Sequence, residues 1–299
     1  MEPQAESSMQ SIHRIRGLLP QLNQTVSNFT HSSQAFRIVH TLPAAKPISA
    51  PKTLLILDSS FNPPTNAHLS LALSTLSKPS ERYPGPYRLL LLLSTSNADK
   101  APSPASFEHR LALMIMLAVD LRLLNEKAKE IDIDIGLTKE PYYTNKSFAI
   151  ATAAKSGEVK EYPPEVDQVH LMGYDTLIRF LDPKYYKSFN PPLSALESFF
   201  ESGYGAICTK RAASQSGDFS DLVAEQEAYL EDLRAGKLEK EGFKPAWAKN
   251  LAMVEASSEA EGVSSTLVRK AAKSKDWDAV KKMCSEGISE WIRSEALYD

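Results

Sequence analysis

The residues most able to do chemistry gather in one segment, residues 59–68 (SSFNPPTNAH). Its two prolines stiffen a turn that delivers Thr65 and His68 to the first turn of an expected helix. Backbone N–H groups and a positive dipole end meet at a helix start, so an anionic phosphate is the natural ligand there. For His68 alone, a capped helix with a half-exposed histidine is the simpler interpretation.

A second cluster, residues 263–269 (VSSTLVR), has the same character. Ser264, Ser265 and Thr266 open another expected helix, and Arg269 projects from its early turns. Hydroxyl and amide donors together with a planar guanidinium suit the oxygens of a polyphosphate. Two such helix starts in one chain therefore imply a polyphosphate ligand.

Further polar residues follow other expected strands. Asp175 lies in the first turn of a helix that begins after Gly173, where its carboxylate could bind a ribose hydroxyl or only favour the helix dipole. Lys100 and Asn97 lie in a polar loop, and Arg211 follows a later strand. Lys100 alone is only a surface lysine, so the common position of these residues after strands carries the argument.

Short apolar runs separated by helical patterns supply the elements that position these residues. The expected strands are 53–57, 88–93, 131–135, 168–172, 204–208 and 250–255. The expected helices are 66–77, 106–124, 146–155, 174–181 or 193–201, 219–235, 265–274 and 276–296. Strands that alternate with helices run parallel and are joined by right-handed crossovers. The pattern predicts an α/β, doubly wound, Rossmann-like sheet of six mainly parallel strands, with helices on both faces and a C-terminal helical extension. Ligands of such sheets collect at the carboxyl ends of the strands, where the polar residues lie.

Two segments lie outside this alternation. Residues 1–51 form an expected N-terminal helical extension and linker, with a helical pattern over 9–32 followed by three prolines. The main domain is expected over 52–299, and within it residues 212–249 form a charged helical insertion that should face water.

Composition excludes several classes of function. A formal net charge of -3 argues against a nucleic-acid-binding surface. Cys208 and Cys284 have no metal-ligand spacing and form no disulfide framework, and no metal site is expected. No apolar run is long enough to span a membrane, and no secretory pattern opens the chain. We expect an intracellular protein of the cytoplasm or nucleus. Residues 7–57 lack acidic side chains, as mitochondrial presequences do, but a helix packed on the domain is the preferred interpretation.

The two clusters resemble the nucleotidyltransferase superfamily marked by an (H/T)-x-G-H turn and an I-S-S-T-x-x-R turn. Within it, the nicotinate/nicotinamide mononucleotide adenylyltransferases are most similar, in a divergent fungal-type branch. Their opening signature, G-S-F-N-P-x-T-x-x-H, resembles residues 59–68, and their closing signature resembles residues 263–269. Ser59 and Ala67 stand where the family has glycines.

Weaker likenesses lie between the two signatures and follow the family's order. They are Ser96-Asn97 with Lys100, His109-Arg110 with Met114 (H-R-x-x-M), Tyr143-Thr144 (S-Y-T), residues 173–177 (G-x-D-x-L) and Arg211. The resemblance covers residues 53 to about 275, so it assigns 52–299 as the nucleotidyltransferase domain.

The resemblance implies adenylyl transfer from ATP to nicotinamide or nicotinate mononucleotide, giving NAD or its deamido form and pyrophosphate by in-line attack. Mg²⁺ would be held mainly by the ATP phosphates. The partners implied are these two nucleotides and possible further copies of the chain in a homo-oligomer. By the same resemblance, His68, Thr65 and Arg269 are catalytic. The implied ATP-binding residues are Ser60, Phe61, His68, Gly173, Asp175, Arg211, Ser264, Ser265, Thr266 and Arg269. The implied mononucleotide-binding residues are Ser60, Phe61, Asn97, Lys100, Tyr143 and Thr144.

Two other functions fit the same residues. One is a nucleotidyltransferase with another phosphorylated acceptor. The other is a nucleotide-binding regulatory protein or weak ATPase on the same fold, because a fold does not determine function and Ser59 lies inside the site.

Overall fold

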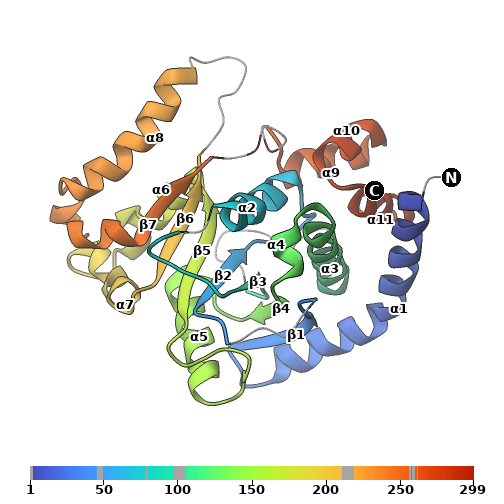
Figure 1. Cartoon of the computed structure of the whole chain (residues 1–299), viewed down its shortest axis with the longest axis horizontal. Helices are drawn as coiled ribbons and strands as arrows, with labels where there is room; N and C mark the ends of the chain where they lie inside the picture. Colours follow the sequence, from blue (N-terminus) through green and yellow to red (C-terminus); the bar gives the residue numbers. More distant parts are fainter. Residues whose placement is uncertain are drawn as a thin grey trace.

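A sheet of seven strands forms the centre of the part of the chain that the structure describes (Figure 1). This computed structural model describes residues 3–45, 50–78, 80–96, 105–210, 219–255, 257, 260 and 262–299. The strands are β1 (Phe36–Leu42), β2 (Thr53–Asp58), β3 (Tyr87–Ser94), β4 (Ile133–Thr138), β5 (Asp167–Gly173), β6 (Gly205–Thr209) and β7 (Leu251–Val254).

The order of the strands across the sheet is β1-β4-β3-β2-β5-β6-β7. Strands β2 to β7 run parallel, and β1 pairs antiparallel with β4 at one edge. The chain builds outward from β2 through β3 and β4, then returns to add β5 on the other side of β2. The direction of winding therefore reverses between β2 and β5, and the doubly wound fold is confirmed. In such sheets ligands bind at the carboxyl ends of the strands beside the reversal.

Helices cover both faces of the sheet (Figure 1). The α-helices are α1 (Pro3–His31), α2 (Asn66–Ser77), α3 (Phe107–Leu124), α4 (Glu126–Lys129), α5 (Tyr143–Lys155), α6 (Tyr174–Phe180), α7 (Glu197–Glu201), α8 (Phe219–Arg234), α9 (Ser265–Lys273), α10 (Trp277–Met283) and α11 (Glu286–Ser294). Short 3-10 turns are η1 (Pro183–Tyr186), η2 (Pro192–Leu196), η3 (Glu239–Glu241) and η4 (Pro245–Asn250). The expected helix 276–296 is divided into α10 and α11, because Ser285 caps the start of a new helix through the N–H of Ile288.

Successive residues of each strand enter two separate cores, because side chains alternate between the faces of a sheet. In β2, Leu55 and Leu57 pack with α1, α2 and α3, whereas Leu54 and Ile56 pack with α5. With both faces covered, a strand can be apolar throughout, which is why the parallel strands were readable as short apolar runs.

The middle of helix α3 is apolar on all sides because it is buried on all sides. Residues 111–118 are all buried. Helices α1 and α11 pack against α3 and bring Ile12, Phe29 and Trp291 into the same core. The N-terminal helix therefore packs on the domain.

The edge strand β1 was missed by the sequence-based expectation of six strands. Only Phe36 of this strand is fully buried, and its polar residues include Arg37 and His40. Its register with β4 is also irregular between Ile38 and His40. The strand has no clear alternation of its own, so its conformation depends on pairing with β4.

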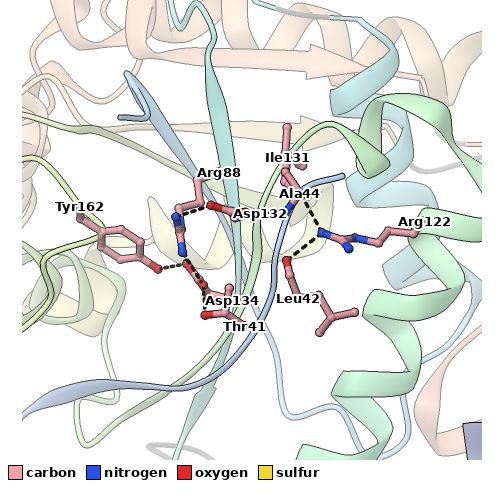
Figure 2. A network of polar contacts seen from close by, with 9 residues as sticks. All are labelled: Thr41, Leu42, Ala44, Arg88, Arg122, Ile131, Asp132, Asp134 and Tyr162. Atoms are coloured by element: carbon pink, nitrogen blue, oxygen red, sulfur yellow. Dashed lines mark hydrogen bonds and ion pairs between the residues drawn. The ribbon is translucent and has the colours of Figure 1, made fainter. Parts of the chain in front are cut away.

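A buried polar network fastens β1 to the sheet (Figure 2). The Arg88 guanidinium on β3 donates to Asp134 at 2.6 and 3.0 Å and to Asp132 at 2.6 Å. The Thr41 hydroxyl on β1 and the Tyr162 phenol also donate to Asp134, at 2.7 and 2.9 Å. The carboxylate of Asp134 is fully buried and satisfied by three partners, as a charge in a protein interior must be.

The segment 212–249 differs in part from the solvated insertion that was expected. Near its end, Leu230, Leu233, Phe243 and Trp247 are buried in a second core with α7. Trp247 stacks on Phe200 with 5.2 Å between ring centroids and so anchors this part of the chain. Among the described residues, no helix is both long and apolar enough to cross a membrane.

Candidate active site

A cavity of about 300 Å³ opens where the winding of the sheet reverses. Its walls come from the end of β2, the end of β3, the start of α5, the helix α6 and the turn η1. The residues that line it are Asp58, Ser59, Ser60, Ser94, Ser96, Arg110, Pro141, Tyr142, Tyr143, Lys146, Thr176, Arg179, Phe180, Tyr185 and Tyr186. A polar cavity at this position is what the fold predicts for a ligand site.

Beside the cavity, His68 and Thr65 form the capped start of α2. The backbone N–H of Thr65 donates to His68 Nδ1 at 3.0 Å, and Thr65 Oγ1 lies 3.0 Å from the same nitrogen. On the other side of the ring, His68 Nε2 lies 2.8 Å from Ser59 Oγ. Burial lowers the pKa of His68 to about 4. The ring is therefore neutral near pH 7 and brings no positive charge to the site.

The second signature, at the start of α9, contacts the loop that leads into α2. Ser265 Oγ donates to Pro63 O at 2.8 Å, and Arg269 Nη1 donates to Asn62 O at 2.7 Å. Ser264 caps α9 through the N–H of Leu267. The two helix starts that were inferred separately are therefore joined by direct hydrogen bonds.

Thr266 and Arg269 of α9 contact each other beside this loop. The Thr266 hydroxyl accepts a 3.2 Å hydrogen bond from Arg269 Nη2. Together with the contact to Asn62 O, this bond fixes the plane of the guanidinium beside the loop. A planar cation held in this way is suited to two phosphate oxygens at once.

The cavity contains more cationic than acidic side chains. The Arg110 guanidinium donates to Ser60 O at 2.7 Å, and burial lowers its pKa to about 10, so it stays charged near pH 7. Lys146 forms a buried ion pair with Asp58. Arg179 donates through Nε to Asp175 O at 3.3 Å and also lines the cavity. The balance favours an anionic ligand.

One wall of the cavity is aromatic. The Tyr143 ring meets those of His170 and Phe180 edge-on, with centroids 5.1 and 5.6 Å apart. Tyr186, held by a 2.8 Å hydrogen bond to Phe180 O, and Tyr185 continue this wall. A flat heteroaromatic ring could pack against such a surface.

The structure brings together many of the residues singled out from the sequence. Ser60 and Tyr143 line the cavity, while Thr65, His68, Ser265 and the other α9 residues surround the adjoining loop. Gly173 and Asp175 lie at the junction of β5 and α6, beside the reversal.

Other residues predicted from the sequence are placed differently. The Phe61 ring is fully buried and packs on His68 at 5.4 Å between centroids, so only its backbone is placed to meet a nucleotide. Thr144 does not line the cavity, and its hydroxyl donates to Asn145 at 3.3 Å. Asn97, Lys100 and Arg211 lie outside the described residues.

Several cavity residues were not assigned a role from the sequence. Asp58 could have been found, because it is the last residue of a strand that ends at the site. Arg110 had a signal, because it belongs to the H-R-x-x-M likeness. Lys146 and Arg179 are cations within helices, and no local pattern distinguishes them from surface residues.

Comparison with known proteins places the chain among its relatives. No family model matches it. A Schizosaccharomyces pombe protein assigned as a nicotinamide mononucleotide adenylyltransferase is 32% identical over 247 residues, which cover 81% of this chain and 84% of that protein. A solved Plasmodium falciparum nicotinic acid mononucleotide adenylyltransferase complexed with APC aligns over 83% of this chain and 98% of its own, with 12% identity and a TM-score of 0.45. Thermotoga maritima TmcAL bound with alpha-thio ATP aligns over 82% and 56%, with 12% identity and a TM-score of 0.39. On its identity to the Schizosaccharomyces pombe protein, the chain belongs to the nicotinamide mononucleotide adenylyltransferase family.

Proposed function

We propose that this protein transfers the adenylyl group of ATP to nicotinamide mononucleotide, or to its nicotinate form, and releases pyrophosphate. The observation that carries the proposal is the meeting of two helix starts, α2 and α9, beside a cationic and aromatic cavity at the reversal of the sheet. The name of the Schizosaccharomyces pombe relative supports the same reaction.

The loop and the two helix starts are assigned to the triphosphate. The positive dipole ends at the starts of α2 and α9 favour anions, and Arg269 adds a fixed positive charge. Asp175, in the first turn of α6, is assigned to the ribose of ATP. Lys100 and Arg211 are assigned to phosphate charge on the family resemblance alone.

The cavity is assigned to the mononucleotide. Its tyrosine wall suits the pyridine ring, and Arg110 and Arg179 suit the 5′-phosphate. The cavity volume of about 300 Å³ lies at the lower end of the range for small-molecule sites. The cavity and the loop share Ser59 and Ser60, so the two substrates would meet at the end of β2.

The proposed reaction is a single in-line displacement. An oxygen of the mononucleotide's 5′-phosphate forms a bond to the α-phosphorus of ATP, and the bond from that phosphorus to the bridging oxygen of the β-phosphate breaks. Pyrophosphate carries away the electron pair of the broken bond, and no covalent enzyme intermediate forms. Such a transfer needs mainly positioning and charge stabilisation.

ATP would enter as its magnesium complex, with the ion held mainly by phosphate oxygens and water. Among the described residues no cluster of three or more His, Cys, Asp or Glu side chains could hold a metal ion. Asp58 is the only carboxylate among the described cavity residues, and Lys146 neutralises it. This donor set fits an ion that is carried by its nucleotide.

The test is an assay with purified protein, ATP, Mg²⁺ and each pyridine mononucleotide in turn. Chromatography should detect the dinucleotide, and a coupled assay should detect pyrophosphate in equal amounts. A reaction without a mononucleotide serves as the control. Phosphate release without any dinucleotide would overturn the proposal and indicate a nucleotide-binding regulatory protein or weak ATPase.

A further inference from the structure

The imidazole of His68 has a single proton to offer. Because burial keeps the ring neutral near pH 7, only one of its nitrogens carries hydrogen. The backbone N–H of Thr65 donates to Nδ1 at 3.0 Å, so Nδ1 must be the acceptor. The proton therefore lies on Nε2.

That proton is already used within the protein. Ser59 Oγ lies 2.8 Å from His68 Nε2 and is its acceptor. A hydroxyl can accept and donate at the same time, so the O–H of Ser59 stays available for another partner. Ser59 lines the cavity, whereas His68 is not among the residues that line it. The group that a ligand in the cavity meets first is the serine hydroxyl.

We propose that Ser59 is a phosphate-binding residue of this active site, and that His68 acts through it as a positioning residue. The inference rests on the proposed function: Ser59 lies where the cavity meets the loop that is assigned to the triphosphate, and the ligand is an oxygen of the ATP triphosphate. The Nε2–H of His68 fixes Ser59 Oγ, and the hydroxyl donates its own proton to the phosphate. The relay gives this chain a donor at a position where the resembling family has a glycine.

The alternative is that phosphate displaces Ser59 and takes the His68 proton directly. Displacement would break the 2.8 Å bond between Ser59 and His68, whereas the relay adds a bond and breaks none. The backbone of Ser59 is also held, because its N–H donates to Leu92 O at 3.2 Å. The relay is thus the arrangement that the existing contacts favour.

The two arrangements predict opposite effects for Ser59→Ala. Under the relay, the variant loses a hydrogen bond to a charged oxygen, so kcat/KM for ATP should fall about tenfold or more. Under displacement, the variant frees the His68 proton, so kcat/KM should stay the same or rise. The affinity for ATP, measured by calorimetry without a mononucleotide, should weaken in parallel under the relay.

A double-mutant cycle tests the role of His68. In the Ser59→Ala background, His68→Ala should cost less than about a further threefold in kcat/KM, because its route to the phosphate is already gone. Losses that multiply would overturn the relay. Thermal unfolding of each variant checks that the comparison is made on folded protein.

The matched control is Ser147→Ala. Ser147 Oγ lies 2.8 Å from His170 Nε2, which is the same pairing of hydroxyl and imidazole, but neither residue lines the cavity. This variant should lose stability and keep its affinity for ATP. If the wild-type protein makes no dinucleotide, the proposed function fails. If it makes dinucleotide and Ser59→Ala matches or exceeds it, only this inference fails.

Discussion

At the scale of single residues, the ion pair between Lys146 and Asp58 is a buried charged contact in the wall of the cavity. Both side chains are only 7% exposed. Charges removed from water in this way are tolerated because each compensates the other. The ammonium of Lys146 also lies 5.2 Å from the centre of the Tyr143 ring, which links the pair to the aromatic wall.

Lys146→Met should lower the free energy of unfolding by about 3–5 kcal/mol, because it leaves the Asp58 carboxylate buried without a partner. The double variant Asp58→Asn/Lys146→Met should recover much of that loss. Urea unfolding of the two single variants and the double variant measures the coupling. A double variant whose loss of stability equals the sum of the two single losses would show that the pair is not coupled.

At this scale, the sequence predicted the positions of residues that belong to a local backbone pattern. Thr65, His68 and Ser265 were found because helix starts have a local sequence pattern. Lys146 was missed because its role depends on Asp58, which is 88 positions away in the chain. Contacts of this kind exist only once the sheet has brought the elements together.

At the scale of elements, the C-terminal helices act as a clamp on the loop before α2. Three side chains donate hydrogen bonds to three successive carbonyl oxygens of this loop. The pairs are Arg269 to Asn62, Ser265 to Pro63 and Cys284 to Pro64. Tyr298 adds a fourth contact, because its hydroxyl donates to Asn62 Oδ1 at 2.9 Å. Two of the three loop residues are prolines, which cannot donate backbone hydrogen bonds, so the clamp holds the loop by its acceptors.

Tyr298→Phe should loosen this clamp while leaving the ring in place. Loss of one neutral hydrogen bond should cost about 0.5–1.5 kcal/mol in unfolding free energy. We expect kcat to fall severalfold with little change in KM for the mononucleotide, because the loop lies on the triphosphate side. Steady-state kinetics with each substrate varied in turn provides the measurement. Tyr185→Phe, in the cavity wall, is the contrasting variant and should alter KM for the mononucleotide instead. Identical effects of the two variants would contradict the assignment of the loop to the triphosphate and of the cavity to the mononucleotide.

The elements themselves were predictable to different degrees. The parallel strands and most helices followed from apolar runs, because burial on both faces leaves a strong pattern. Strand β1 could not be found this way, since six of its seven residues are only partly buried. Its place depends on the Thr41 contact to Asp134 and on pairing with β4, which are long-range interactions (Figure 2).

At the scale of the whole molecule, folding keeps the rings of His68 and His170 uncharged. Burial, together with the nearby charge of Lys146, lowers the pKa of His170 to about 3, and burial lowers that of His68 to about 4. Asp120 behaves in the opposite way, because burial raises its pKa to about 6. Each of these shifts makes the stability of the fold depend on pH.

The sign of that dependence follows from which state binds the proton. Above pH 6.5 the histidines are neutral whether folded or unfolded, and their contribution to stability is complete. Below pH 6.5 His68 and His170 become protonated in the unfolded chain but stay neutral in the folded protein. Stability therefore falls until the pH passes the folded pKa values. Between pH 6 and about 4 the folded protein binds one proton on Asp120. This binding offsets roughly the stability lost through one of the two histidines. For these three groups, the net expected loss is about 1.4 kcal/mol per pH unit in that interval, reduced by solvent screening at His68, which is only half-buried.

Urea unfolding at pH 7, 5.5 and 4.5 should show this decline. His170→Phe should reduce the slope, because it removes one of the two histidines, and Asp120→Asn should steepen it. A slope that neither variant changes would assign the pH dependence to other groups.

The clamp on the loop also has a consequence for how the protein is made. The donors to Asn62, Pro63 and Pro64 lie 202 to 220 positions later in the chain. A nascent chain on the ribosome can assemble β2, β3 and the start of α2 long before those donors are synthesised. We therefore expect the nucleotide site to mature last, so that a growing polypeptide does not bind ATP in the finished geometry until residues 265–284 have left the exit tunnel.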